Sequence, residues 1–202
     1  TVVLSRQSKK REPCSVGFAG AIVAATGMMY IRLWILLLLF AAPLAYRLTA
    51  LFWGLGIAAI IVGSLLARTA KSGNGCKFDP TTDRRDGNPL EITSAFTFAA
   101  IFLAILVATK VVAERFGSTG VLVMAAIMGA ADVDPFILGL TQTIGTGLDL
   151  GVAALAVVIA SAVNNLMKGI YAIIFGSVRT GRLSLSLLSF LGAVSVALFL
   201  LF

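Results

Sequence analysis

Histidine is absent from this sequence of 202 residues, and charged residues make up only 12% of it. The lack of imidazole excludes histidine-based catalysis, His-ligated zinc or haem, and the usual histidine proton relay. Cysteine occurs only at Cys14 and Cys76, which match no metal or redox spacing. The sequence also lacks a Ser/Lys pair at catalytic spacing. We therefore expect a protein that is not an enzyme and that carries no cofactor.

The scarcity of charge is matched by an excess of apolar residues. Hydrophobic residues make up 59% of the chain, and the mean hydropathy is +1.01. Soluble domains contain roughly 45–50% apolar and about 25% charged residues. A soluble fold of this length could not bury so much apolar surface, so lipid is the expected solvent. The net charge of +7 comes from basic residues at the ends of hydrophobic runs, which indicates membrane topology and not nucleic-acid binding.

Crossing a bilayer requires about 20 apolar residues. Six hydrophobic segments meet or approach that length: 14–40, 44–67, 91–113, 118–147, 150–178 and 182–202. The sequence thus predicts an all-α, polytopic helical membrane protein with about six transmembrane segments, in one integral membrane domain over residues 1–202. A basic segment (1–13) precedes the first span, and 68–90 forms an aqueous loop. Because no Met begins the sequence, we expect a piece of a longer chain.

Basic residues predict the orientation of these segments. The basic clusters within 6–11 and 68–85 both indicate the cytoplasmic side. Two hydrophobic segments lie between them, and two crossings return the chain to the same side, so the two clusters predict the same orientation. An ordinary span over 118–147 would place Arg179 and Arg182 outside. A re-entrant or hairpin element would return them to the cytoplasmic side, and this second topology is the one we favour.

Two pairs of segments are similar at nearly the same offset: 24–33 with 160–169, and 47–56 with 182–192. The first pair aligns Arg32 with Lys168. Apolar helices also resemble each other by chance, so duplication of the first and last helix pairs and coincidence both stay open. In transporters built from repeats, binding sites lie at the repeat interface.

The segment MGAADVDPFILGL places Asp132 and Asp134 within the fourth apolar run. On a continuous helix, residues two apart point about 200° away from each other. An ionisable side chain in mid-membrane costs several kcal/mol. Pro135 also disfavours helical geometry at Asp134 and removes a backbone donor. The sequence therefore predicts two half-helices joined by an unwound "ADVD". They cover roughly 119–131 and 135–146.

The two acids have different expected roles. Asp134 precedes Pro135, which is the arrangement of an N-cap followed by proline at the first helical position. Asp132 has no such local function. It either forms a structural ion pair with a neighbouring helix or faces a cavity as a functional carboxylate. Paired carboxylates with oxygen partners suit a hard cation or a proton, although the sequence does not identify a metal.

The fifth segment carries four polar side chains on one helical face: Ser161, Asn164, Asn165 and Lys168. Such residues either hold helices together or line a site. Lys168 and Arg32 both lie within apolar runs, where an unpaired charge is costly. We expect Asp132 or Asp134 to pair with Lys168 or Arg32, with the asparagines completing the hydrogen bonds.

Three motifs carry a family resemblance. They are NP-x-E at Asn88, Pro89 and Glu91, G-x-ADVD at 129–134, and the Asn164–Lys168 spacing; Arg32 in MMYIRLWILL also fits. Together they resemble the uncharacterised membrane domain that follows an MgtC/SapB-type domain in many prokaryotic proteins. The resemblance covers nearly the whole chain. It implies an integral protein of the prokaryotic cytoplasmic membrane with a fused or associated MgtC-like domain, but not magnesium transport.

The leading hypothesis is a transporter-like protein that binds or moves a small ion or solute at an intramembrane polar site. The site would consist of Asp132, Asp134, Asn164, Asn165 and Lys168, with Arg32 as charge partner. The alternative is a non-transporting sensory, scaffolding or regulatory module in which the same residues form structural pairs. Expected partners are the lipid bilayer, a small cation or proton, the MgtC-like domain and a second copy of the chain.

Overall fold

The computed structural model describes residues 1–10, 15–71, 92–144 and 148–201. These residues form seven α-helices: α1 (Val2–Lys10), α2 (Ser15–Phe40), α3 (Ala42–Lys71), α4 (Ile92–Ala131), α5 (Val133–Thr141), α6 (Leu150–Phe175) and α7 (Val178–Leu201). They contain no strand beyond an isolated bridge between Ile144 and Leu148. The all-helical fold class is therefore confirmed. Both cysteines, most of the aqueous loop and the NP-x-E motif lie outside the described residues.

Four of the described helices are long and apolar enough to cross a membrane: α2, α3 over Ala42–Thr69, α6 and α7. A helix of 26 residues, such as α2 or α6, is about 39 Å long at 1.5 Å per residue. That length exceeds the roughly 30 Å hydrocarbon core of a bilayer. Large apolar side chains also face outward, including Leu39 at 72% and Phe190 at 69% exposure. This outer surface fits contact with lipid and supports the integral membrane class.

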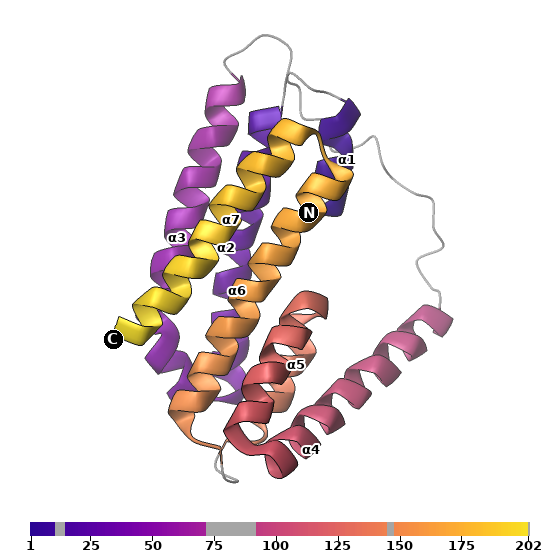
Figure 1. The fold of residues 1–202 in the computed structure, drawn as a ribbon, viewed down its shortest axis with the longest axis vertical. Helices are drawn as coiled ribbons and strands as arrows, with labels where there is room; N and C mark the ends of the chain where they lie inside the picture. Colours follow the sequence, from indigo (N-terminus) through magenta and orange to yellow (C-terminus); the bar gives the residue numbers. More distant parts are fainter. Residues whose placement is uncertain (11–14, 72–91, 145–147, 202) are drawn as a thin grey trace.

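Glycines let α2 and α3 pack closely as an antiparallel pair. A Cβ on Gly20 would lie 2.6 Å from the carbonyl oxygen of Gly63, and a Cβ on Gly27 would lie 2.6 Å from that of Gly56. Small residues of this kind are what membrane helices use to bring backbones together. Helices α6 and α7 form a second antiparallel pair (Figure 1). Antiparallel pairing is common in polytopic proteins, so the internal repeat stays a prediction.

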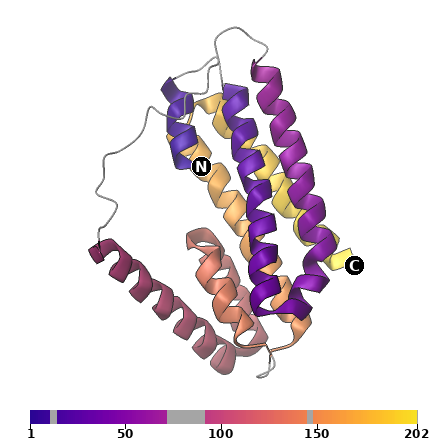
Figure 2. The same ribbon diagram turned by 180° about the vertical axis from the view of Figure 1, so that it is seen from behind.

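Helix α4 bends sharply at Gly117, whose φ of 58° and ψ of −147° are not helical. A positive φ is accessible to glycine at little cost because glycine has no Cβ. The bend divides α4 into a first arm, 92–116, and a second arm, 118–131. The first arm slants away from the bundle, whereas the second arm and α5 form a helical hairpin that points into it (Figures 1 and 2).

The tip of this hairpin is the break predicted from Asp132, Asp134 and Pro135. The backbone leaves helical geometry only at Asp132, with φ −144° and ψ 122°, and α5 then runs back toward the start of α6. A broken fourth element is therefore confirmed. The predicted boundaries of the second half-helix, 135–146, are wrong, because helical geometry resumes at Val133 and ends at Thr141.

The hairpin packs into the main core of the protein. Val133, Phe136 and Leu140 of the hairpin are buried with Tyr30 of α2 and Phe52 of α3. Gly129 meets α6 so closely that a Cβ there would lie 2.5 Å from the carbonyl oxygen of Ala160. The apolar faces of the hairpin therefore fix its tip inside the bundle.

Short polar contacts place the turn between α6 and α7 beside α1. The Ser177 amide donates to Ser8 Oγ at 3.1 Å, and Thr180 Oγ1 donates to the Ser15 carbonyl at 3.0 Å. The Arg6 guanidinium lies over the Phe175 ring, 5.3 Å from its centroid. The α6–α7 turn and the beginning of α2 thus lie at one end of the molecule, as a returning hairpin between α4 and α6 requires.

Candidate functional site

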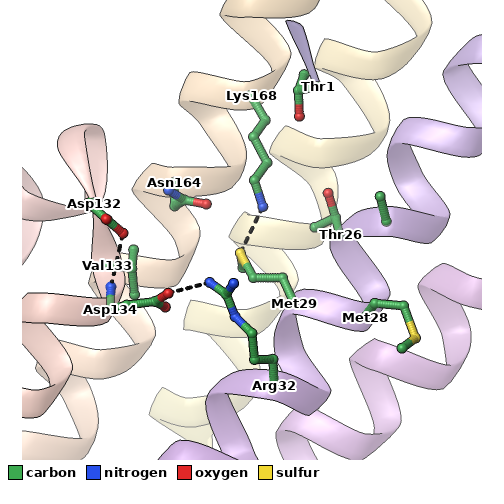
Figure 3. Close-up of a pocket in the computed structure, with 11 residues that line it drawn as sticks. Thr1, Thr26, Met28, Met29, Arg32, Asp132, Val133, Asp134, Asn164 and Lys168 are labelled. Carbon is green, nitrogen blue, oxygen red and sulfur yellow. Dashed lines mark hydrogen bonds and ion pairs between the residues drawn. The ribbon is translucent and has the colours of Figure 1, made fainter. Parts of the chain in front are cut away.

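A cavity of about 640 Å³ lies beside the hairpin tip. It is lined by Thr1, Ala25, Thr26, Met28, Met29, Arg32, Asp132, Val133, Asp134, Asn164 and Lys168. Figure 3 shows side chains from α2, α6 and the tip pointing toward this shared space. Five of the six residues predicted for the site and its charge partner line the cavity. The exception is Asn165.

Asp134 and Arg32 form an ion pair across the cavity wall. Arg32 Nη2 lies 2.5 Å from Asp134 Oδ2, and the exposed fractions of the two side chains are 61% and 28%. This is one of the four pairings that the sequence left open. The other carboxylate oxygen, Asp134 Oδ1, is buried and has no hydrogen-bond partner among the described residues.

Asp132 caps the N-terminus of α5. Its Oδ1 accepts a hydrogen bond from the Asp134 amide at 3.2 Å. The prediction that Asp134 is the cap is wrong, because helical geometry begins at Val133, two residues before Pro135. Pro135 then occupies the third helical position, where the backbone N–H that it lacks would have had no acceptor within the helix. Asp132 remains exposed beside the cavity.

Lys168 extends from α6 into the cavity (Figure 3). Its Nζ donates to the Met29 sulfur at 2.7 Å. Among the described residues, no carboxylate lies within ion-pairing distance of Nζ. A thioether is a weak acceptor, and an ammonium group has three donors. Lys168 is therefore the cationic group of the site whose charge the described carboxylates leave unpaired.

The two asparagines of α6 have different surroundings. Asn164 Nδ2 donates to the Gly129 carbonyl of the hairpin at 3.2 Å, and its side chain lines the cavity. Asn165 is fully buried, and its Nδ2 donates to Tyr30 Oη at 2.7 Å. Consecutive residues on a helix point about 100° apart, so the pair cannot share one environment. Asn165 thus joins helices within the core, and the structure places it outside the cavity.

Sequence reasoning missed the α2 residues that complete the cavity wall. Thr26, Met28 and Met29 line it together with Arg32. The signal for Met28 and Met29 was available, because they lie four and three positions before Arg32 and share its helical face. Oxygen ligands for a metal are few in this wall. Among the described residues, no three His, Cys, Asp or Glu side chains group closely enough to hold a metal ion.

Comparison with known proteins identifies the family but no activity. The model of the domain of unknown function DUF4010 matches residues 1–176. An uncharacterised protein of Aquifex aeolicus (strain VF5) is 37% identical over 91 residues, which span 45% of this chain and only 40% of that relative. No solved structure matches the chain. The link to MgtC/SapB-type proteins finds no support here and stays a prediction. Because the family model covers most of the 202 residues, the chain belongs to the DUF4010 family.

Proposed function

We propose that this DUF4010 protein is transporter-like and that it binds and moves a small ion or solute at the hairpin tip. The observation that carries the proposal is the cavity around the helix break, with four ionisable side chains in its wall. Ionisable groups inside a membrane are costly and mark substrate or ion pathways. Interrupted helices at membrane depth are tolerated where they line a cavity, and they form the binding sites of many transporters.

The proposed topology has five complete crossings and one re-entrant hairpin. The crossings are α2, α3, the first arm of α4, α6 and α7, and the hairpin is the second arm of α4 with α5. The α1 end would be cytoplasmic, because the described charged side chains there are all basic: Arg6, Arg68, Arg179 and Arg182. The opposite end carries acids as well: Arg47, Glu114, Arg115 and Asp149.

Transport is testable with purified protein in liposomes. Currents on a solid-supported membrane would be recorded with gradients of protons, Na⁺, K⁺, Mg²⁺ and small carboxylates. We expect at least one gradient to drive a current that Asp134→Asn and Lys168→Met abolish. Glu114→Gln, a neutralised exposed acid far from the cavity, is the matched control and should keep the current. Wild-type protein that gives neither a current nor ligand-dependent thermal stabilisation with any of these solutes would overturn the proposal.

The alternative is a non-transporting sensory, scaffolding or regulatory module. One observation favours it: the Arg32–Asp134 pair satisfies both charges without any ligand. Under this alternative, neutralising Lys168 would leave every functional readout unchanged, because only the ion pair would matter. A Lys168→Met variant that loses a solute-driven current would therefore exclude the structural role for the cavity.

A further inference from the structure

The two carboxylates of the cavity are already engaged by the protein itself. Asp134 pairs with Arg32, and Asp132 accepts the Asp134 amide at the N-terminus of α5. A helix N-terminus carries roughly half a positive charge, which offsets part of the Asp132 charge. Each acid thus has one oxygen engaged by the protein, and the second oxygen of Asp134, Oδ1, is buried. This differs from the hard-cation site that the sequence alone suggested.

The cations of the cavity are less fully engaged. Among the described residues, Lys168 Nζ donates a hydrogen bond only to the Met29 sulfur, so most of its donor capacity is unused. Arg32 has five N–H donors, one nitrogen in contact with Asp134, and a largely exposed side chain. The unused donors of the wall therefore lie mainly on two positively charged groups, Lys168 and Arg32.

A charged lysine among apolar helices is stabilised only by a partner for its charge. The cavity has room for one, since its volume of about 640 Å³ is that of a small-molecule site. Asn164 and Thr26 line the same space and add neutral polar groups beside Lys168. A partner suited to this charge has the chemistry of an oxyanion, which charge-assisted hydrogen bonds from lysine and arginine would hold.

We infer that the ligand of this site presents an anionic oxygen group, a carboxylate or a phosphate, to Lys168, with Arg32 as the second donor. The inference rests on the proposed function and specifies the class of its substrate. Asp132 and the α5 N-terminus would lie beside the anion as part of the tip. They would set its position without pairing with it.

Four-carbon probes of different charge test this inference. The full chain in phosphatidylcholine nanodiscs would be melted with succinate, succinamide or 1,4-diaminobutane, and separately with inorganic phosphate, at constant ionic strength. We expect succinate or phosphate to raise Tm by about 3 °C at tenfold excess over Kd, and the neutral and cationic probes to leave it unchanged. Lys168→Met should lose the shift. Lys110→Met, which neutralises an exposed lysine outside the cavity, should keep it.

A second variant guards against a Lys168 substitution that fails to fold. Asn164→Asp keeps the shape of the side chain and adds a carboxylate beside Lys168, so it should abolish stabilisation by anions. Stabilisation by 1,4-diaminobutane or a metal cation would overturn the inference and leave the proposed function standing. Anion stabilisation that survives both variants would overturn the assignment to this cavity. No shift with any of these soluble probes, and none with an anionic lipid, would overturn the inference and the proposed function together.

Anionic lipid headgroups share this chemistry, so a second arm separates the two sources. The melts would be repeated in nanodiscs that contain phosphatidylglycerol. Phosphatidylglycerol could stabilise wild type but not Lys168→Met, while succinate and phosphate have no effect. That result would support the anion-binding chemistry and overturn movement of a solute. A response to the soluble anions in phosphatidylcholine alone supports both.

Discussion

Asp132 combines a charge with a capping hydrogen bond, and single substitutions can separate the two. Asp132→Asn keeps an oxygen that can accept the Asp134 amide, so its free energy of unfolding should stay within a few tenths of a kcal/mol of wild type. Asp132→Ala removes the cap and should cost about 1 kcal/mol. Thermal unfolding in detergent measures both. Equal losses for the two variants would show that the charge, and not the cap, stabilises the tip.

The Arg32–Asp134 pair should couple energetically. Asp134→Asn or Arg32→Met alone leaves one charge unpaired beside the cavity, and each should lower the free energy of unfolding by about 1–2 kcal/mol. The double variant should cost less than the sum of the two, with a coupling energy of about 1 kcal/mol. Arg32 is too exposed for the larger cost of a fully buried pair. Additive losses would mean that the pair contributes nothing.

The polar residues of the site could be predicted individually but not their partners. Acids and bases in apolar runs stand out because lipid penalises them, so Asp132, Asp134, Arg32 and Lys168 were all identified. Their pairing depends on where the hairpin tip meets α2, which local sequence does not encode. Asn164 and Asn165 were inseparable for the same reason. A rotation of α6 about its axis by less than about 100°, the angle between consecutive residues, decides which of the two faces the cavity.

At the scale of elements, close helix packing in the α2–α3 pair depends on glycine. A Cβ at Gly63 would lie 2.5 Å from both Ala24 N and Gly20 O, whereas a Cβ at Gly54 meets nothing within 4 Å. Gly63→Ala should therefore force the helices apart and cost about 1–3 kcal/mol. Gly54→Ala, in the same helix, should be neutral or stabilise by up to about 1 kcal/mol. Equal responses in thermal unfolding would contradict the close approach.

The two interruptions of the helical chain between Ile92 and Thr141 differ in how visible they are in the sequence. The break at Asp132 was predictable because two acids and Pro135 cannot continue an apolar helix without cost. An interruption near Gly117 was predicted, because the third segment was expected to end at 113 and the fourth to begin at 118, but the turn through a positive φ was not. A lone glycine is tolerated within membrane helices, and only tertiary packing selects a positive φ there. The distribution of basic residues had favoured a hairpin that folds back, but only the structure gives its geometry.

For the whole molecule, the hairpin decides on which side of the membrane α6 begins. If the second arm of α4 and α5 return to one side, the α6–α7 turn lies on the same side as α1. An ordinary span at this place would put them on opposite sides. Single cysteines would report this topology if introduced at Val3, Val178 and Phe116. All three side chains are well exposed, at 58%, 69% and 69%, and are uncharged, so the substitutions keep the charge of the protein.

Each cysteine would be introduced singly after Cys14 and Cys76 are replaced by serine, and intact bacterial cells would be treated with a membrane-impermeant maleimide. We expect Phe116→Cys to be labelled from outside, because it adjoins the Gly117 bend, at the end that the proposed topology places outside the cytoplasm. Val3→Cys and Val178→Cys should be labelled only after the cells are opened, since the basic residues near them favour the cytoplasm. Labelling of Val3→Cys and Val178→Cys from opposite sides would show that the fourth element spans the membrane. The cavity would then lie along a complete crossing and not at a re-entrant tip.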